Sequence, residues 1–476
     1  MLRGLAVAKR LLSKESLATY PPLVYFDPDT DGLIAGLFIV TYLSNLGVQY
    51  DYYINPNRTH GFFLEPQLVA GRTIINGDFA ITTPEMEAIV SSGSNVVSMD
   101  HHETEDSLIH QVMGPNEGIV INNQYPFEDP LNRYQSGAQV TWEVLKEIDP
   151  TLDTKTNRAL VGLTLLTDVR DIENERAKKY LRELYNHPYK GYIRYLIDST
   201  KGKDYSFGVP RLDRNYVDFT LNPKINAMLR LGYEQEAVSF ILGGGLPDTD
   251  FQKIQQRMRK RFTKLARVRE MERVVFFELQ EGDFAADDSK YLPTFLGLVA
   301  NDFTKGGKSA LGWVRELNGG ISRASFRAGL PGVRYRSFLA TYINAQGHES
   351  AFGVLDFRPT SKILNLIDLA AKEAEGGYTV EVDYHEVVNL GKFLPLEGRK
   401  IAEENLYKMS YNKTYIKYVG STAAINELVI RDNYQKYNIN SIDVVGFDRG
   451  AHPSKDFILP TVERGIVRCY LQKVGN

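Results

Sequence analysis

Short apolar runs alternate with helical patterns over the first 170 residues of the chain. The runs "PLVYF", "RTIING" and "NVVSMD" predict strands, and the stretches "LIAGLFIVTYLSNLG" and "PEMEAIVSSG" between them predict helices. Strands that alternate with helices imply right-handed crossovers and a parallel sheet, whose functional residues gather at the carboxyl ends of the strands. Asp27, Asp78 and Asp100 each stand at such a strand end.

Three further regions are predicted after this first domain of residues 1–175. Residues 176–272 show helical patterns with charged faces and predict a helical linker region. Strands and helices return at "RVVFFEL", which predicts a second α/β domain over residues 273–378. Residues 379–476 carry runs such as "YIKYVG" and "SIDVVGF", and predict a β-rich module with an OB-like fold as one interpretation. The expected fold class is therefore α/β with a β-rich C-terminal module.

Composition narrows the class of protein. Hydrophobic content of 43% with 24% charged residues is typical of a soluble globular protein. The chain has no apolar stretch of roughly 18 residues, so we expect no membrane partner. The single cysteine, Cys469, excludes a disulfide framework and indicates a reducing, cytoplasmic compartment. The amphipathic start "MLRGLAVAKRLLSKES" lacks the apolar core and cleavage site of a signal peptide, and predicts a first helix packed on the core.

The net charge of −3 does not exclude a nucleic-acid partner, because phosphate binding depends on a local basic face. One such face is predicted for a helix over residues 253–270, "KIQQRMRKRFTKLARVRE". An ordinary solvated helix is the alternative interpretation of this segment.

The stretch "DPDTDG" at residues 27–32 places three aspartates two positions apart. This spacing also opens an EF-hand calcium loop, which requires a flanking helix and a bidentate Glu at position 12. Position 12 is Phe38, and the preceding "LVYF" predicts a strand, so an EF-hand is excluded. No Lys or Arg stands between Pro21 and Asn57. Because clustered carboxylates repel one another, a bound cation is the simplest compensation.

Further candidate metal ligands follow later strands and helices. "SMDHHETE" supplies two adjacent histidines after Asp100, and "LTLLTDVRD" supplies Asp168. Neighbouring side chains on a tight turn point in different directions, so one histidine can bind a metal while the other faces substrate. A His-His pair alone is weak support, but together with Asp78 in "INGDFA" it completes four acidic clusters at intervals suited to successive sheet edges.

The four stretches "DPDTDG", "INGDFA", "MDHHETE" and "LLTDVRD" together resemble motifs I to IV of the DHH phosphoesterase superfamily. "YQSGAQVTWEVL" resembles the helix that follows the DHH motif there. "NER" at 174–176 and "LNPKINAMLRLG" at 221–232 resemble segments of RecJ-type exonucleases, while "SRASFRAG" and "NAQGHESAFGV" resemble the DHH-associated domain. Leu229 and Gln346 depart from the family, which has glycine at both positions.

The resemblance implies two divalent ions per site, Mn²⁺ or Mg²⁺, and hydrolysis of phosphodiesters by a two-metal mechanism. Asp78 would bridge the ions, Asp27 and Asp31 would complete one site, and Asp29, His101 and Asp168 the other. His102 would contact the scissile phosphate or protonate the leaving oxygen, with Asp100 fixing the histidine turn. Substrate-binding candidates are Arg323, Ser325, Arg327 and His348 of the second domain, and Asn226 and Arg230 of the linker.

The leading functional hypothesis is a RecJ-like exonuclease that degrades single-stranded DNA from the 5′ end to mononucleotides, as in DNA repair or recombination. A single-strand-binding protein or a helicase could deliver the substrate. The alternatives are a phosphodiesterase acting on short oligonucleotides (nanoRNA) or cyclic dinucleotides, and a non-catalytic scaffold like the eukaryotic replication factor that resembles RecJ. The first alternative usually carries a histidine where this chain has Asp27, and the second has lost metal ligands that this chain keeps.

Overall fold

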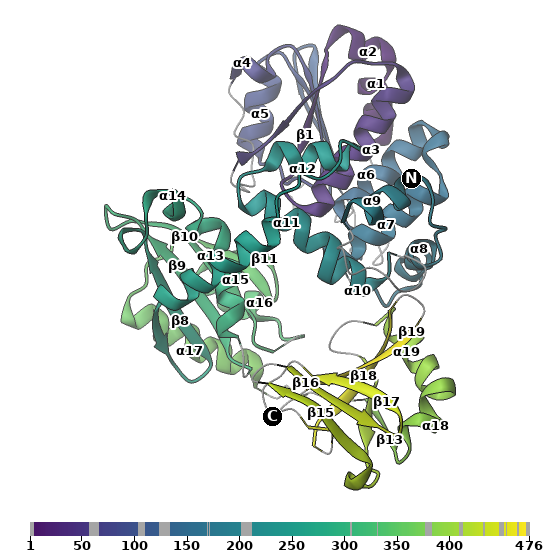
Figure 1. Cartoon of the computed structure of the whole chain (residues 1–476). Coiled ribbons are helices and arrows are strands. Elements are labelled where there is room, and N and C mark those ends of the chain that lie inside the picture. Colours follow the sequence, from purple (N-terminus) through teal and green to yellow (C-terminus); the bar gives the residue numbers. More distant parts are fainter. Residues whose placement is uncertain are drawn as a thin grey trace. The chain divides into compact units, whose positions relative to one another are not determined.

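The chain is described by a computed structural model. The described residues are 4–56, 66–102, 110–122, 134–168, 170, 172–200, 212–304, 307–330, 332–376, 383–408, 413–431, 434–446, 452–453, 455–463 and 466–472. They fall into two compact units, one of residues 1–249 and 463–465 and the other of residues 250–462 and 466–476 (Figure 1). Among the described residues, no helix is long and apolar enough to cross a membrane.

The first unit is built on a six-stranded sheet. Its strands are β1 (Pro22–Phe26), β2 (Asp51–Ile54), β3 (Thr73–Gly77), β4 (Asn95–Asp100), β5 (His110–Met113) and β6 (Asn116–Asn122). Their order is β2-β1-β3-β4-β6-β5, and every neighbouring pair is parallel except β5 with β6. All residues of β1, β3 and β4 are buried, which explains why these strands are continuous apolar runs. The predicted parallel sheet is confirmed.

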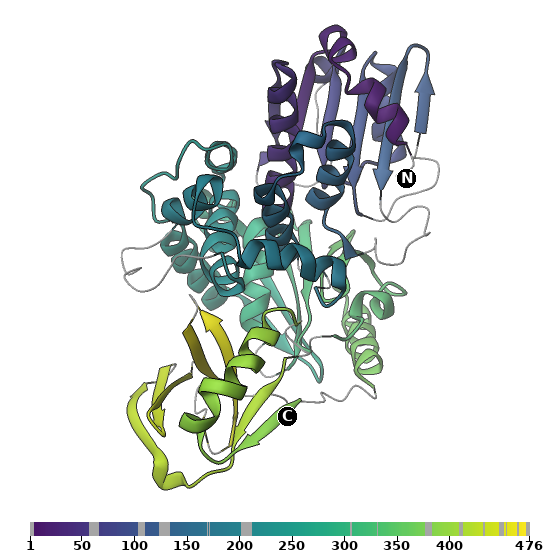
Figure 2. The same cartoon turned by 90° about the vertical axis from the view of Figure 1, so that its right-hand side faces the viewer.

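Helices cover both faces of this sheet (Figure 2). On one face, α5 (Thr83–Ser91) packs its apolar side against the residues of β1, β3 and β4 that include Leu23. On the opposite face, α3 (Thr30–Leu46) and α6 (Gly137–Ile148) lie on the same strands. Gly36 of α3 lies directly against the ring of Phe26. Any larger residue at this position would therefore overlap that ring.

The remaining helices of the first unit surround this core. They are α1 (Leu5–Leu11), α2 (Lys14–Thr19), α4 (Pro66–Val69), η4 (Pro150–Leu152), α7 (Lys155–Thr167), α8 (Glu175–Tyr185), α9 (Gly191–Thr200), α10 (Arg214–Tyr216), η5 (Val217–Leu221), α11 (Asn222–Arg230) and α12 (Glu234–Ile241). Helix α1 buries Leu5, Ala8 and Leu11, as expected for a first helix packed on the core.

The second unit contains a mixed six-stranded sheet. Its strands are β7 (Arg267–Glu270), β8 (Val274–Gln280), β9 (Ser309–Arg315), β10 (Ile321–Arg327), β11 (Asn344–His348) and β12 (Ala351–Leu355), in the order β11-β12-β10-β9-β8-β7. Its helices are α13 (Phe251–Leu265), η6 (Glu281–Asp283), α14 (Ala286–Ser289), α15 (Leu292–Phe303), α16 (Tyr335–Leu339) and α17 (Ser361–Glu375). This is the predicted second α/β domain.

The structure differs from the sequence prediction at the end of the basic helix. The basic helix ends at Leu265 instead of residue 270, and "RVRE" forms the edge strand β7, paired antiparallel with β8. Phe262 of α13 packs against Phe284 and Phe295 of the same unit. The second compact unit begins at Asp250 and also includes the C-terminal module, so the domain boundary at residues 272 and 273 stays a prediction.

The C-terminal residues form a seven-stranded sheet, which confirms the β-rich prediction. Its strands are β13 (Tyr384–Val387), β14 (Tyr415–Tyr418), β15 (Ile425–Arg431), β16 (Tyr434–Ile439), β17 (Ile442–Gly446), β18 (Phe457–Glu463) and β19 (Ile466–Gln472), in the order β13-β14-β18-β19-β17-β16-β15. The sequence did not predict the short helices α18 (Leu390–Phe393), η7 (Leu394–Gly398), α19 (Arg399–Asn405) and η8 (Thr422–Ala424). The OB-like interpretation stays a prediction.

Gly36 gives a test of how α3 is seated on the sheet. In Gly36→Ala the new methyl group would overlap the buried Phe26 ring, so we expect a loss of at least about 1 kcal/mol in stability despite the better helix propensity of alanine. Urea unfolding followed by Trp142 fluorescence, in a Trp313→Phe background, measures this in the first unit. Phe26→Leu should partly restore the double variant.

The matched control is Gly353→Ala in β12, where an added Cβ meets no atom closer than 3.8 Å. Because β12 belongs to the second unit, this control is measured by Trp313 fluorescence in a Trp142→Phe background. Equal stability changes for the two glycine variants would contradict the close packing of α3.

Candidate metal centre

The centre lies at the carboxyl edge of the first sheet. Because β1, β3 and β4 are parallel neighbours in register, with Phe26 opposite Gly77 and Gly77 opposite Met99, the residues that follow them emerge side by side. Asp27 and Asp78 follow β1 and β3 directly, and Asp100 ends β4. All three are buried.

Helix α3 contributes two more carboxylates. Asp29 is its N-cap, and its Oδ1 accepts a hydrogen bond from the Gly32 amide at 3.0 Å. Asp31 lies in the first turn, where Oδ2 accepts from the Gly137 amide at 2.8 Å and Oδ1 from the Ala138 amide at 3.3 Å. The N-termini of α3 and α6 thus both point at this acidic cluster, and their dipoles stabilise negative charge there.

Two glycines let the carboxylates approach so closely. A Cβ at Gly32 would overlap the side chain of Asp27, and a Cβ at Gly137 would overlap the backbone and side chain of Asp78. Asp78 itself adopts a left-handed backbone conformation, with φ of 63°, and its amide donates to the Met99 carbonyl at 3.0 Å. A non-glycine residue in this conformation is uncommon and is typical of functional sites.

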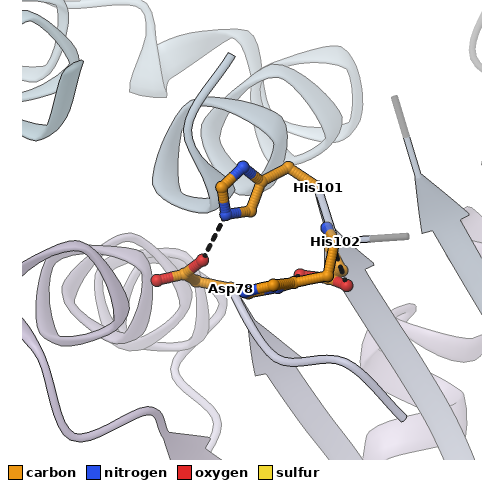
Figure 3. Close-up of side chains that lie close together, drawn as sticks. Asp78, His101 and His102 are labelled. Carbon is orange, nitrogen blue, oxygen red and sulfur yellow. Dashed lines mark hydrogen bonds and ion pairs between the residues drawn. The ribbon is translucent and has the colours of Figure 1, made fainter. Parts of the chain in front are cut away.

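His101 completes the inner part of the centre, as Figure 3 shows. Its Nδ1 lies 3.1 Å from the carbonyl of Gln135, and its Nε2 lies 3.0 Å from Oδ1 of Asp78. A carbonyl only accepts hydrogen bonds, so Nδ1 carries a proton. Burial, countered in part by Asp168, lowers the pKa of His101 to about 4. Neutral His101 therefore aims an unprotonated nitrogen at a carboxylate oxygen.

Asp168 approaches the same histidine from α7. It is the C-cap of that helix, and its Oδ2 lies 3.7 Å from Nδ1 of His101 and 3.6 Å from Nε of Arg170. Arg170 is the nearest cationic group that the structure describes around this carboxylate, and it lies outside the stretch free of basic residues noted in the sequence.

The carboxylates repel one another strongly. Burial raises the pKa of Asp78 well above its usual range, and the neighbouring Asp31, Asp29, Asp27 and Asp168 raise it further. Burial also raises the pKa of Asp31, with contributions from Asp168 and Asp29 that outweigh its hydrogen bonds. Such a set is costly without a compensating positive charge.

His102 differs from His101 in charge and exposure. Its Nδ1 donates to Oδ1 of Asp100 at 2.8 Å, and its amide donates to Oδ2 at 3.2 Å. Desolvation lowers the pKa of His102, but the charge and hydrogen bond of Asp100 outweigh this effect and raise it to about 9. In turn, burial would raise the pKa of Asp100, but His102 brings it below its usual range. The His102 side chain is 44% exposed, so a positive charge faces solvent here.

The donor atoms form three groups that could hold a metal ion, each within 4.8 Å. They are Asp27 with Asp29 and Asp78; Asp31 with His101 and Asp168; and Asp78 with Asp100, His101 and His102. These carboxylates and a neutral imidazole fit Mn²⁺ or Mg²⁺. This grouping of the ligands differs from the assignment suggested by the sequence, in which Asp31 and Asp29 had exchanged places. The reason is that Asp29 turns back to cap α3, whereas Asp31 turns toward α6.

Asn222 of helix α11, a residue not expected from the sequence, is hydrogen-bonded to the carboxylate loop. Oδ1 of Asn222 accepts from Thr30 Oγ1 at 2.6 Å and from Asn226 Nδ2 at 2.7 Å. Thr30 stands between Asp29 and Asp31. Arg230 Nη1 lies 3.4 Å from the carbonyl of Asn226. The linker candidates Asn226 and Arg230 therefore belong to a helix that contacts the loop.

The other substrate-binding candidates lie in the second unit. Arg323, Ser325 and Arg327 alternate along β10 and share one face, and Arg327 Nη1 donates to Ser325 Oγ at 3.0 Å. The guanidinium of Arg327 lies directly over Gly297 of α15. His348 stands on β11, and its side chain is outside the described part of the structure. Their role at the metal centre stays a prediction.

Several residues that support the centre were not expected from the sequence. They are Thr30, Gly32, Gln135, Gly137, Arg170 and Asn222. Gly32 and Gly137 stand inside quoted motifs, so the small residues in "DG" and "SGA" were an available signal. The role of the Gln135 carbonyl left no signal in the sequence, because every residue supplies a backbone carbonyl.

The sequence of the first unit matches a known protein family. Residues 23–167 match the DHH family, N-terminal domain. The chain is 26% identical over 218 residues to the SPbeta prophage-derived protein YorK of Bacillus subtilis (strain 168), which is named as a candidate single-strand DNA-specific exonuclease. That match covers 45% of this chain but 36% of YorK, so this chain spans little more than a third of that relative.

Solved structures share the fold. RecJ of Thermus thermophilus in complex with Mn²⁺ superimposes with a TM-score of 0.68 at 17% identity, over 100% of this chain and 71% of that one. An exonuclease RecJ bound to manganese gives a TM-score of 0.52 at 18% identity, over 80% of this chain and 96% of that one. Residues 23–167 therefore match the DHH family, N-terminal domain, and the chain shares the fold of the RecJ structures.

Proposed function

We propose that the chain is a metal-dependent exonuclease that hydrolyses single-stranded DNA to mononucleotides, starting from the 5′ end. The observation that carries the proposal is the contact of His101 Nε2 with Asp78 Oδ1 at 3.0 Å inside a cluster of carboxylates, most of which are buried. When Asp78 is ionised, both atoms present lone pairs to each other and repel at this distance, so the arrangement is suited to a shared cation.

Asp78 would bridge two divalent ions. Asp27 and Asp29 would complete one site, while Asp31, His101 and Asp168 would complete the other. Mn²⁺ suits this donor set best and Mg²⁺ next, because both prefer carboxylates and an imidazole favours Mn²⁺. When bound, such ions supply activation of the attacking water and stabilisation of charge on the phosphoryl oxygens.

The chain's own groups prepare the site for a phosphodiester. The Gln135 carbonyl fixes the ring of His101 so that Nε2 faces the carboxylates. Asp100 holds His102 protonated at neutral pH, and the exposed ring can contact an anionic phosphate or give its proton to the departing oxygen. Asn222 holds the loop of Asp29 and Asp31 against α11.

The choice of substrate rests on the relatives. YorK is named as a candidate single-strand DNA-specific exonuclease, and the two solved structures described above are named RecJ, one of them as an exonuclease. In the second unit, Arg323 and Arg327 on one face of β10 would bind the phosphates of the strand, together with His348. Asn226 and Arg230 would guide it on the first unit.

Single-stranded DNA labelled separately at each end tests the function directly. With Mn²⁺, we expect a 5′ label to be released at once as a mononucleotide, while a 3′ label stays in gradually shortened strands. A chelator should abolish release, because the carboxylates then lack their compensating ions. Pentanucleotides and cyclic dinucleotides are assayed in parallel, and faster hydrolysis of either than of the long strand would overturn the proposal.

Replacing the bridging carboxylate separates catalysis from folding. Asp78→Asn should lower hydrolysis by more than the roughly 10- to 100-fold that is usual for outer-shell residues of metal sites, since it removes a direct ligand. In a chelator the variant should melt at a higher temperature than the wild type, because the neutral amide relieves repulsion among the buried carboxylates.

Added Mn²⁺ should then raise the melting temperature of the wild type but not that of Asp78→Asn. The matched control is Asp248→Asn at an exposed position of the same unit, which should change neither quantity. A variant of Asp78 that is less stable than the wild type without metal would contradict the repulsion argument.

The role of His102 is tested by changing the leaving group of the substrate. His102→Gln should lower kcat by about 10²- to 10⁴-fold with little change in KM, since a proton donor for the transition state is lost. A strand with a bridging phosphorothiolate at the scissile bond needs no proton on its sulfur, and should be cleaved by variant and wild type at similar rates. An equal loss on both substrates would assign His102 to phosphate binding instead.

A further inference from the structure

Helix α13 of the second unit carries charge that the proposed function does not use. Its 15 residues, "FQKIQQRMRKRFTKL", include six basic side chains and no acidic one. Its inner side is apolar, since Phe262 is fully buried against Phe284 and Phe295, and Phe251 is buried as well. The helix is thus anchored on its own unit by aromatic packing.

Some of the basic side chains are part of this anchor. Arg259 donates to both oxygens of Asp302, at 2.9 and 2.7 Å, and Thr263 donates to the same carboxylate at 2.8 Å. Arg261 pairs with Asp288. These contacts account for the two arginines beside the buried face as structural groups.

The other basic residues of α13 form a separate outward stripe. Lys253, Arg257, Lys260 and Lys264 are spaced by four, three and four residues, so at about 100° per residue they lie within an arc of roughly 60°. Phe262 lies about 180° from Lys253, on the opposite side. All four side chains are exposed, and none has an ion pair with a residue that the structure describes. We call these four residues the α13 stripe.

An ordinary solvated helix face does not account for this arrangement. On other exposed helices of the chain, basic side chains pair with acids three or four positions away, as Lys178 does with Glu175 and Arg399 with Glu403. The α13 stripe instead places like charges at i and i+4 twice, which destabilises a helix. A chain with a net charge of −3 thus concentrates uncompensated positive charge along roughly 16 Å of one helix.

We propose that the α13 stripe binds the phosphate backbone of a single-stranded nucleic acid, as a contact separate from the metal centre. A row of cations without flanking acids is the electrostatic footprint of phosphate binding. Cores of protein interfaces are depleted in lysine, and three of the four residues here are lysines, which disfavours an acidic protein as the partner. The choice of a single strand rests on the proposed function. The stripe would make long strands bind more tightly than short ones.

The test uses the full chain in a chelator, so that binding is measured without hydrolysis. The stripe variant carries K253Q, R257Q, K260Q and K264Q, and fluorescence anisotropy measures its Kd for 40-mer and 6-mer oligothymidylate over a range of salt. For the 40-mer we expect a roughly 10- to 100-fold weaker Kd, and a slope of log Kd against log salt smaller by about 0.7 per lost contact, or about 2 to 3 in total. The 6-mer should change less than about twofold.

The control variant removes the same charge from exposed lysines outside α13. It carries K9Q, K14Q, K155Q and K190Q, all in the first unit, and should bind the 40-mer as the wild type does. Equal losses in the stripe and control variants would mean that net charge alone matters, and would overturn the proposal. An unchanged Kd in the stripe variant would overturn it as well.

Two half-variants, K253Q with R257Q and K260Q with K264Q, keep the test decisive should the fourfold variant misfold, and each should show about half the change in slope. Tighter stripe-dependent binding of a 40-base-pair duplex, or equal competition by polyglutamate, would assign the surface to another partner and overturn the proposal. Stripe-dependent binding by a chain that hydrolyses no strand would leave this proposal standing while the proposed exonuclease fails. Hydrolysis of the strand by a chain whose binding does not depend on the α13 stripe would overturn this proposal and leave the proposed exonuclease standing.

Discussion

Repulsion among buried carboxylates is the constraint around which the first unit is organised. Six aspartates contribute to the candidate metal centre at one edge of a sheet, and all except Asp29 and Asp168 are buried. The fold lowers this cost in part with dipoles. The N-termini of α3 and α6 point at the cluster, and backbone amides of Gly32, Gly137 and Ala138 donate to its oxygens. Because the pKa values of Asp31 and Asp78 are still raised, these amides compensate the charge only partly, and the remainder is what a cation would neutralise.

The same constraint explains where the chain uses glycine. Carboxylates that bind a common ion must approach more closely than helix and strand packing normally allows. Gly32 and Gly137 remove the Cβ atoms that would push Asp27 and Asp78 away, and the left-handed conformation of Asp78 turns its side chain from the line of β3 toward His101. The two glycines and the left-handed residue are thus concentrated where the carboxylates lie closest together.

Much of this centre could be predicted from the sequence, because central parallel strands are continuous apolar runs and their ends are easy to locate. Asp27, Asp78 and Asp100 followed from that pattern alone. The division of ligands could not be predicted, since the direction of Asp31 depends on amides 106 and 107 residues away in α6. Strand β7 could not be predicted for another reason. All four residues of "RVRE" are exposed at the sheet edge. The segment therefore lacks the alternation of apolar and polar residues that would distinguish a strand from the end of a basic helix.

The two adjacent histidines show how partners, not residue type, set chemical roles. His101 faces a carbonyl that holds a proton on Nδ1 and sits in a site where burial lowers its pKa to about 4, so it stays neutral and offers a nitrogen lone pair. His102 faces the carboxylate of Asp100, which raises its pKa to about 9 and keeps it cationic. A neutral imidazole and a cationic one therefore stand one residue apart, as the proposed roles of metal ligand and phosphate contact require. The turn after β4 can place both only because Asp100 points toward one ring and Gln135 toward the other.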